Sequence, residues 1–172
     1  MMTENTVSSS SLSSKTFYIE NLGCSKNQVD AETIIAALKR AGWKHCDSPD
    51  RAELIIVNTC GFIKSAKEES INTLFEFREQ YPDRKVLAAG CFAQRYNEEL
   101  MDMIPELDGV FGNRAPAMIP GIINDVMSGD KPVYVPEQDL SVPLRDEFLS
   151  FKGSAFVKIG EGCNNRGLSI LL

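Results

Sequence analysis

Residues 17–42 read FYIENLGCSKNQVDAETIIAALKRAG, and the rest of the architecture follows from this pattern. It opens with β-forming apolar residues and continues with a run in which apolar side chains share one face of a helix. The apolar residues on the helix face are Ala31, Ile34, Ile35 and Leu38. Ser25 to Gln28 forms a capping-box pattern, which predicts the start of the helix, and Gly42 predicts its end. The stretch is therefore predicted to be a strand followed by a helix.

The same order recurs along the chain. Further short β-forming runs lie around Trp43 and at Leu54–Val57, Val86–Ala89 and Val110–Phe111. A second helix is predicted from a capping box at Ser65–Glu68, and a fourth from Pro116 to Gly129. The predicted inward residues are Ile71, Leu74 and Phe75 in the second helix and Tyr96, Leu100, Met103 and Ile104 in the third.

Alternating strands and helices predict an α/β fold. We expect a flavodoxin-like open parallel sheet with helices on both faces, right-handed crossovers and the strand order 2-1-3-4-5. This domain should span residues 16–130. Residues 1–15 have neither a basic start nor an apolar core, so they are predicted to be a disordered tail and not a secretory signal.

A change in composition follows this domain. Residues 131–152 contain Pro132, Pro136 and Pro143 without a clear period, which predicts a linker. Ala155–Ile159 is then predicted to be a strand that opens a second domain at residues 153–172.

Composition excludes several classes of protein. The chain has 172 residues, of which 43% are hydrophobic and 24% charged, as in soluble globular proteins. A net charge of -6 disfavours nucleic-acid binding by this segment. No apolar run approaches the roughly 20 residues that span a bilayer. We expect a cytoplasmic protein whose five cysteines stay reduced unless a metal binds them.

Three cysteines occupy the same position relative to the predicted strands. Cys24 follows the first strand, Cys60 the third and Cys91 the fourth. Ligands of open parallel sheets bind outside the carboxyl ends of the strands. In the order 2-1-3-4-5 these strands are neighbours, so at about 4.8 Å per strand their loops converge within roughly 10 Å. That separation fits one cluster-sized object.

Each of these cysteines also adjoins a glycine, which permits close approach of backbone N–H groups to sulfur. Soft thiolates select iron–sulfur clusters or zinc. A single cysteine at a strand end is more often a packing residue, but the threefold repetition favours a ligand set. Asn58 is expected either to orient the loop of Cys60 by hydrogen bonding or to be an ordinary turn residue.

Other candidate groups carry little signal. Cys46 lies in a polar turn and is predicted to be structural, and His45, the one histidine, to be a surface or strand-edge residue. No nucleophile-elbow sequence supports a Ser-His-Asp triad, and no glycine-rich phosphate loop occurs.

The chain resembles the methylthiotransferases of the radical S-adenosylmethionine superfamily. The resemblance covers nearly everything from Thr16 to Arg166. It is carried by FYIENLGCSKNQVD (17–30), IIVNTCGFIKSAKEES (55–70), AAGCFAQ (88–94) and FVKIGEGCNNR (156–166).

The resemblance implies a set of cofactors. The amino-terminal domain of this family holds one [4Fe-4S] cluster through three cysteines, which match Cys24, Cys60 and Cys91. One iron stays open for the sulfur to be transferred. A barrel domain carries a second [4Fe-4S] cluster on a CxxxCxxC loop, where S-adenosyl-L-methionine is cleaved to a radical. Cys163 matches the first cysteine of that loop.

The motif around Cys163 then departs from the family. The second and third cysteines should stand at positions 167 and 170, which are Gly167 and Ile170. The abrupt change after Arg166 predicts truncation with an altered reading frame or an artefact, and a natural tail that never bound iron is the alternative. We therefore expect the chain alone to be inactive and to bind one cluster.

The resemblance also indicates a substrate. GCSKNQVD and VNTCGFI are most like the branch that adds a methylthio group to an aspartate of a small-subunit ribosomal protein, with an electron donor protein as a further partner. The alternative is the branch that acts on a tRNA adenosine. Two hypotheses from other classes are a flavodoxin-like module that binds a nucleotide or flavin and a thiol redox protein.

Overall fold

The computed structural model describes residues 15–137 and 144–159. Its strands are β1 (Thr16–Asn21), β2 (Lys44–His45), β3 (Leu54–Thr59), β4 (Lys85–Ala89), β5 (Gly109–Gly112) and β6 (Val133–Tyr134). Its α-helices are α1 (Ser25–Arg40), α2 (Lys64–Gln80), α3 (Gly90–Arg95), α4 (Asn97–Met103) and α5 (Pro120–Ser128). Two short 3₁₀ helices lie at Pro49–Arg51 and Pro116–Met118. None of the helices in these ranges is both long and apolar enough to cross a membrane.

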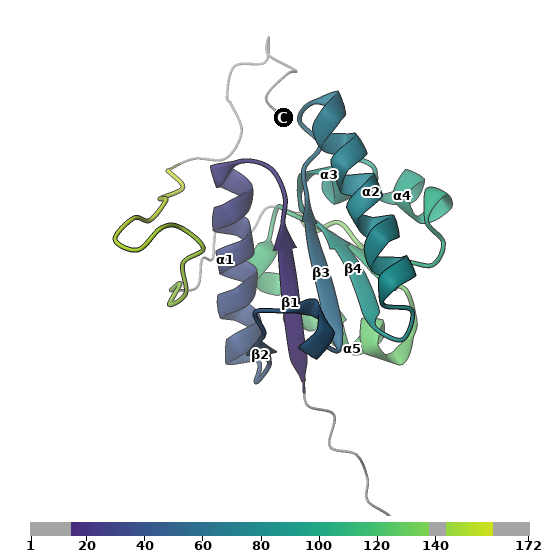
Figure 1. The fold of residues 1–172 in the computed structure, drawn as a ribbon, viewed down its shortest axis with the longest axis horizontal. Helices are drawn as coiled ribbons and strands as arrows, with labels where there is room; N and C mark the ends of the chain where they lie inside the picture. Colours follow the sequence, from purple (N-terminus) through teal and green to yellow (C-terminus); the bar gives the residue numbers. More distant parts are fainter. Residues whose placement is uncertain (1–14, 138–143, 160–172) are drawn as a thin grey trace, which may run out of the picture.

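The six strands form one parallel sheet in the order β2-β1-β3-β4-β5-β6. Figure 1 shows β2, β1, β3 and β4 of this sheet. Every pairing in it is parallel, and the register aligns Asn21 with Asn58 and Asn58 with Ala89. The predicted α/β class, the flavodoxin-like order 2-1-3-4-5 and the open parallel sheet are confirmed. The carboxyl ends of β1, β3, β4 and β5 therefore meet at one edge.

Helices cover both faces of the sheet, and β3 lies between them. All six residues of β3 are buried, as expected of a central parallel strand. Leu54 and Ile56 pack with α1 and α5 on one face. Ile55 and Val57 pack with α2, α3 and α4 on the other face. The two cores hold the strand ends in fixed positions.

The two predicted capping boxes are wrong. Helix α1 begins at Ser25 with Cys24 as its N-cap, and α2 begins at Lys64 with Ile63 as its N-cap. Neither N-cap residue forms a side-chain hydrogen bond, because each serine lies inside the first turn rather than before it. Gln28, the expected partner of Ser25, instead donates to Glu32 and Ser150.

The third predicted helix is interrupted. Tyr96 separates the short helices α3 and α4, and Leu100 and Ile104 are buried as expected. Met103 is 44% exposed and Phe75 of α2 is 45% exposed, so neither faces the core as predicted. A helix that packs on a sheet buries only one narrow face, and both residues lie outside that face.

The sequence does not predict the sixth strand. Val133–Tyr134 lies in the range expected to be a linker and pairs with β5, where Tyr134 stacks on Phe111 with ring centroids 5.8 Å apart. Three prolines in the range obscure a strand of two residues.

The predicted strand at 155–159 is wrong, because these residues take no regular secondary structure. A strand requires a partner for its backbone groups, and the six strands pair among themselves. Residues 144–159 instead lie along α1 (Figure 1). Residues 1–14 of the tail expected at 1–15, residues 138–143 of the expected linker and Cys163 lie outside the described residues.

Leu74 should carry most of the contribution of α2 to stability. It is fully buried, whereas its neighbour Phe75 is 45% exposed. We expect Leu74→Ala to lower the free energy of unfolding by about 2–5 kcal/mol because it leaves a cavity. Phe75→Ala should cost about 1 kcal/mol or less. Urea denaturation measures both values, and similar losses would contradict the assigned inward face.

Candidate metal centre

The carboxyl ends of β1, β3 and β4 lie side by side and carry the three cysteines singled out from the sequence. Asn21, Asn58 and Ala89 form one row across these strands. Cys24, Cys60 and Cys91 follow shortly after that row. Bridges from Thr59 to Gly90 and from Gly90 to Gly112 continue the pairing beyond it. The sheet thus brings all three cysteines to one edge, as predicted.

The three thiols differ in exposure. Cys24 is exposed, Cys91 is intermediate and Cys60 is 5% exposed. The backbone of Cys60 is fixed to α2, because its N–H donates to Ser70 Oγ at 3.0 Å and the Ser70 hydroxyl donates to its carbonyl at 2.9 Å. All three thiols are free, and they range from the surface to the interior.

Gly23 brings the loops of Cys24 and Cys60 together. It has a φ of +92°, and a Cβ atom there would lie 2.6 Å from Cys60 Cβ and 2.7 Å from Cys60 Sγ. Gly90 has a φ of +96°, and a Cβ atom there would lie 2.4 Å from the Thr59 carbonyl oxygen. Both positions require glycine for conformation and for space, whereas the predicted approach of backbone N–H groups to sulfur stays a prediction.

Asn27 connects the loops around the cysteines. It is fully buried, and its Nδ2 donates to the carbonyl oxygens of Leu22 and Thr59, each at 2.9 Å. Its Oδ1 accepts a hydrogen bond from the Cys91 thiol at 3.1 Å. Asn113 Nδ2 donates to Cys91 Sγ, also at 3.1 Å. Two asparagines therefore fix the position of this sulfur.

Asn58 lies within β3, so its predicted interpretation as a turn residue is wrong, and its hydrogen bonds go to β1 and α1 rather than to the loop of Cys60. It is fully buried and donates to Asn21 Oδ1 and to the carbonyl oxygen of Asn27, each at 2.7 Å. Its own Oδ1 is buried without a hydrogen-bond partner among the described residues. The donated bonds join the end of β3 to β1 and to the first turn of α1.

Burial controls the charge state of Cys91. It raises the pKa of this thiol to about 11, and the neighbouring Asp30, Cys60 and Cys24 add to the increase. The Lys26 ammonium, 4.0 Å from Cys91 Sγ, lowers the pKa and opposes the shift. The metal-free thiol is therefore protonated at neutral pH and must lose its proton to bind a metal.

The candidate donor set consists of three free thiols at one edge of the sheet. Among residues 15–137 and 144–159, no group of three or more His, Cys, Asp or Glu side chains is arranged to hold one metal ion. A cluster imposes a different demand, because each thiolate binds a separate iron. The three free thiols are donors of the soft type that iron–sulfur clusters select.

Cys46 and His45 lie away from this edge. His45 pairs with Phe17 near the start of β1, and its Nδ1 contacts Glu147 Oε1. Cys46 is buried, and its thiol donates to the Arg51 carbonyl at 3.6 Å. Both residues have the structural positions that the sequence predicts.

Sequence reasoning missed Lys26, Asn27 and Asn113. Asn113 comes directly after β5, so the rule that singled out the cysteines would also have found this residue. Asn27 is a polar residue of low helix propensity in a helix that is buried on most sides, which is a second usable signal.

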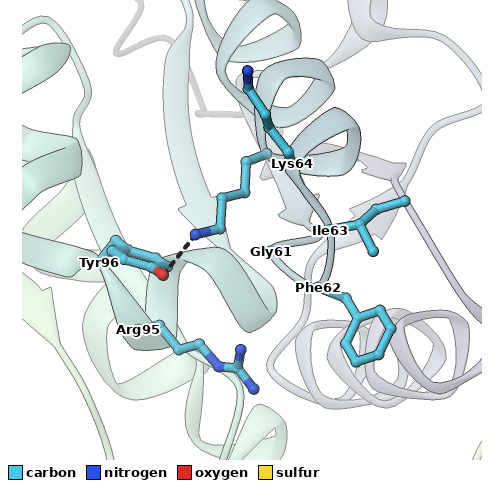
Figure 2. A pocket seen from close by; sticks show the side chains of 7 residues that line it. Gly61, Phe62, Ile63, Lys64, Arg95 and Tyr96 are labelled. Carbon is cyan, nitrogen blue, oxygen red and sulfur yellow. Dashed lines mark hydrogen bonds between the residues drawn. The ribbon is translucent and has the colours of Figure 1, made fainter. Parts of the chain in front are cut away.

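A pocket of about 340 Å³ adjoins the site through Gly61 (Figure 2). It lies between the start of α2 and Tyr96, and Phe62 and Ile63 at its rim are more than half exposed. Lys67 Nζ donates to the Tyr96 hydroxyl at 2.6 Å, and it lies 4.0 Å from the centre of that ring. Of the three cationic side chains that line this pocket, Lys64, Lys67 and Arg95, Lys67 is thus held by its neighbour Tyr96.

The sequence of this chain is similar to those of known proteins. Residues 16–112 match the model of the uncharacterized protein family UPF0004. Proteins described as ribosomal protein uS12 methylthiotransferase RimO are similar. The one from Treponema denticola is 43% identical over 151 residues, covering 83% of this chain and 32% of its own length.

Two further relatives carry the same description. The protein from Syntrophomonas wolfei is 44% identical over 150 residues, covering 84% of this chain and 34% of its own length. The protein from Clostridium acetobutylicum is 38% identical over 154 residues, with 87% and 34% covered. The chain spans about a third of the length of these relatives.

Gly23→Ala should be more damaging than Gly42→Ala. Both glycines have a left-handed φ, so both substitutions cost about 1–2 kcal/mol in backbone strain. A Cβ atom at Gly42 meets nothing within 4 Å, whereas at Gly23 it overlaps Cys60. We expect an additional loss of unfolding free energy for Gly23→Ala in urea denaturation. Equal losses would show that Cys60 does not need this close approach.

Proposed function

This chain belongs to the UPF0004 family, and from that premise we propose that it is the cluster-binding portion of a ribosomal protein methylthiotransferase of the radical S-adenosylmethionine type. The observation that carries the proposal is the gathering of Cys24, Cys60 and Cys91 at one edge of the sheet around Gly23 and Asn27. Three thiolates there would hold one [4Fe-4S] cluster.

The residues of the site divide this task. The three thiolates ligate iron, and Asn113 donates a hydrogen bond that orients Cys91 and lowers the charge on its sulfur. Asn27 keeps the loops at the spacing the ligands need. When bound, the cluster would supply an iron without a protein ligand, at which sulfur can be held for transfer.

The proposed substrate is ribosomal protein uS12, which the names of the relatives specify for those proteins. The predicted chemistry is the addition of a methylthio group to an aspartate of that protein. The tRNA branch, the alternative from sequence, has less support because these three relatives act on a protein by name. An electron donor protein in the cytoplasm completes the set of proposed partners.

Cys163 would be one ligand of the second cluster, and it lies outside the described residues. Gly167 and Ile170 stand where the family motif has its other two cysteines. One thiolate does not hold a cluster that must also bind S-adenosyl-L-methionine. We therefore propose that the 172-residue chain binds one cluster and is inactive in methylthiolation.

Anaerobic reconstitution with iron and sulfide tests the ligand assignment. We expect a brown protein with broad visible absorption. Removing the hydrogen-bond partner of a ligand typically lowers metal affinity by roughly 10–100-fold. Replacing the ligand itself, Cys24, Cys60 or Cys91, with Ala should lower the affinity by more than that, so the bound iron should fall sharply. Iron content per chain is the measurement.

Cys46→Ala is the matched control, because Cys46 is a buried cysteine that lies near the start of β1, away from the carboxyl ends of β1, β3 and β4. It should retain the iron content of the unaltered protein. Similar losses from all four substitutions would overturn the assignment. A colourless protein would favour a thiol redox protein, and a yellow one a flavin-binding module.

The cleavage of S-adenosyl-L-methionine tests the second part of the proposal. The reconstituted chain should release no 5′-deoxyadenosine with a strong reductant, because Cys163 lacks its two partner cysteines. Liquid chromatography with mass detection measures this product. Its formation, together with its loss in Cys163→Ala, would show that the altered motif is functional.

A further inference from the structure

Residues 144–159 place cations against carboxylates that α1 buries. Glu32 is fully buried, and it accepts hydrogen bonds from Arg145 Nη1 and, at 3.0 Å, from the backbone N–H of Leu149. Asp30 is 1% exposed and accepts from Lys158 Nζ at 2.9 Å. Buried carboxylates without partners are costly, so these contacts attach the segment firmly to α1.

Asp30 links this segment to the cysteines. Its Oδ1 faces Lys158, and its Oδ2 lies 3.2 Å from Lys26 Nζ. The same Lys26 ammonium is 4.0 Å from Cys91 Sγ. A continuous series of contacts therefore runs from Lys158 through Asp30 and Lys26 to Cys91.

The net charge of this series depends on Lys158. Lys158 contributes one positive charge to this series, and Asp30 contributes one negative charge. Replacing Lys158 with a neutral residue therefore removes one positive charge from the surroundings of the sulfur. Because one-electron reduction adds one negative charge to a cluster, a nearby positive charge favours the reduced state.

We propose that Lys26, Asp30 and Lys158 are positioning residues through which the segment 144–159 raises the reduction potential of the cluster bound at Cys91. The inference rests on the proposed function, because it requires a cluster at Cys24, Cys60 and Cys91. In this proposal α1 has a second role, because its Asp30 and Lys26 connect the charge of Lys158 to the first cluster site.

Potentiometric titration of the reconstituted protein, followed by electron paramagnetic resonance, tests the inference. Lys158→Ala should make reduction less favourable by on the order of tenfold, since it removes one charge from a partly buried site. For a one-electron couple, tenfold corresponds to a potential lower by about 59 mV. Asp30→Asn removes a negative charge and should raise the potential. Lys158→Arg keeps the positive charge, so it should retain the potential of the unaltered protein.

Lys39→Ala is the matched control. Lys39 also contacts the segment, through Asp146 at 3.0 Å, and its replacement removes the same charge. It lies near the other end of α1, roughly 20 Å from Lys26, beyond the Debye length of about 8 Å at physiological ionic strength. Its potential should equal that of the unaltered protein.

The outcomes separate this inference from the proposed function. If the unaltered protein takes up no cluster, both fail. If the cluster forms and Lys158→Ala has the same potential as Lys39→Ala, the inference alone is overturned. If Asp30→Asn does not fold, the comparison of those two lysine variants still decides the question.

Discussion

The buried amide of Asn27 is the interaction that holds the site together. Its two donor hydrogens meet the carbonyl oxygens of Leu22 and Thr59, and its oxygen meets the Cys91 thiol. One side chain therefore joins the loops after three neighbouring strands. Each buried carbonyl left without a partner would cost about 1–3 kcal/mol, so the amide sets the spacing of the loops as well as the position of one sulfur.

The parallel sheet makes this arrangement possible. In the order β1-β3-β4 all three strands end at the same edge, and two packed layers of helices prevent the ends from moving apart. Gly23 and Gly90 then allow the loops to approach more closely than any residue with a Cβ atom would permit. Rigid strands and unusually close loops together form a site in which thiols differ sharply in exposure.

Electrostatics gives the site its second level of organisation. The chain is acidic overall, yet a lysine lies beside the half-buried thiol and is held there by a buried aspartate. Helix α1 is buried on most sides because the segment 144–159 covers what would otherwise be its outer face. The helix that begins at the cysteine edge is thus also the one that receives the far end of the described chain.

Local patterns in the sequence were enough to predict the α/β class and the candidate ligands. Alternating apolar periods indicated the class, and the threefold pairing of cysteine with glycine at strand ends indicated the ligands. The strand order was taken from the flavodoxin-like fold type, because no local pattern specifies which strands are neighbours. Short-range rules were less reliable at the helix starts, where Ser25 and Ser65 lie inside the first turn.

Contacts between residues far apart in the chain came from the folded structure alone. Asn27 and Cys91 are separated by 64 residues, and Asp30 and Lys158 by 128. No local pattern in the sequence indicates such pairs, because each of these polar side chains, taken by itself, could equally well be exposed to solvent. The same reason hid strand β6, whose two residues are a strand only because β5 offers its edge.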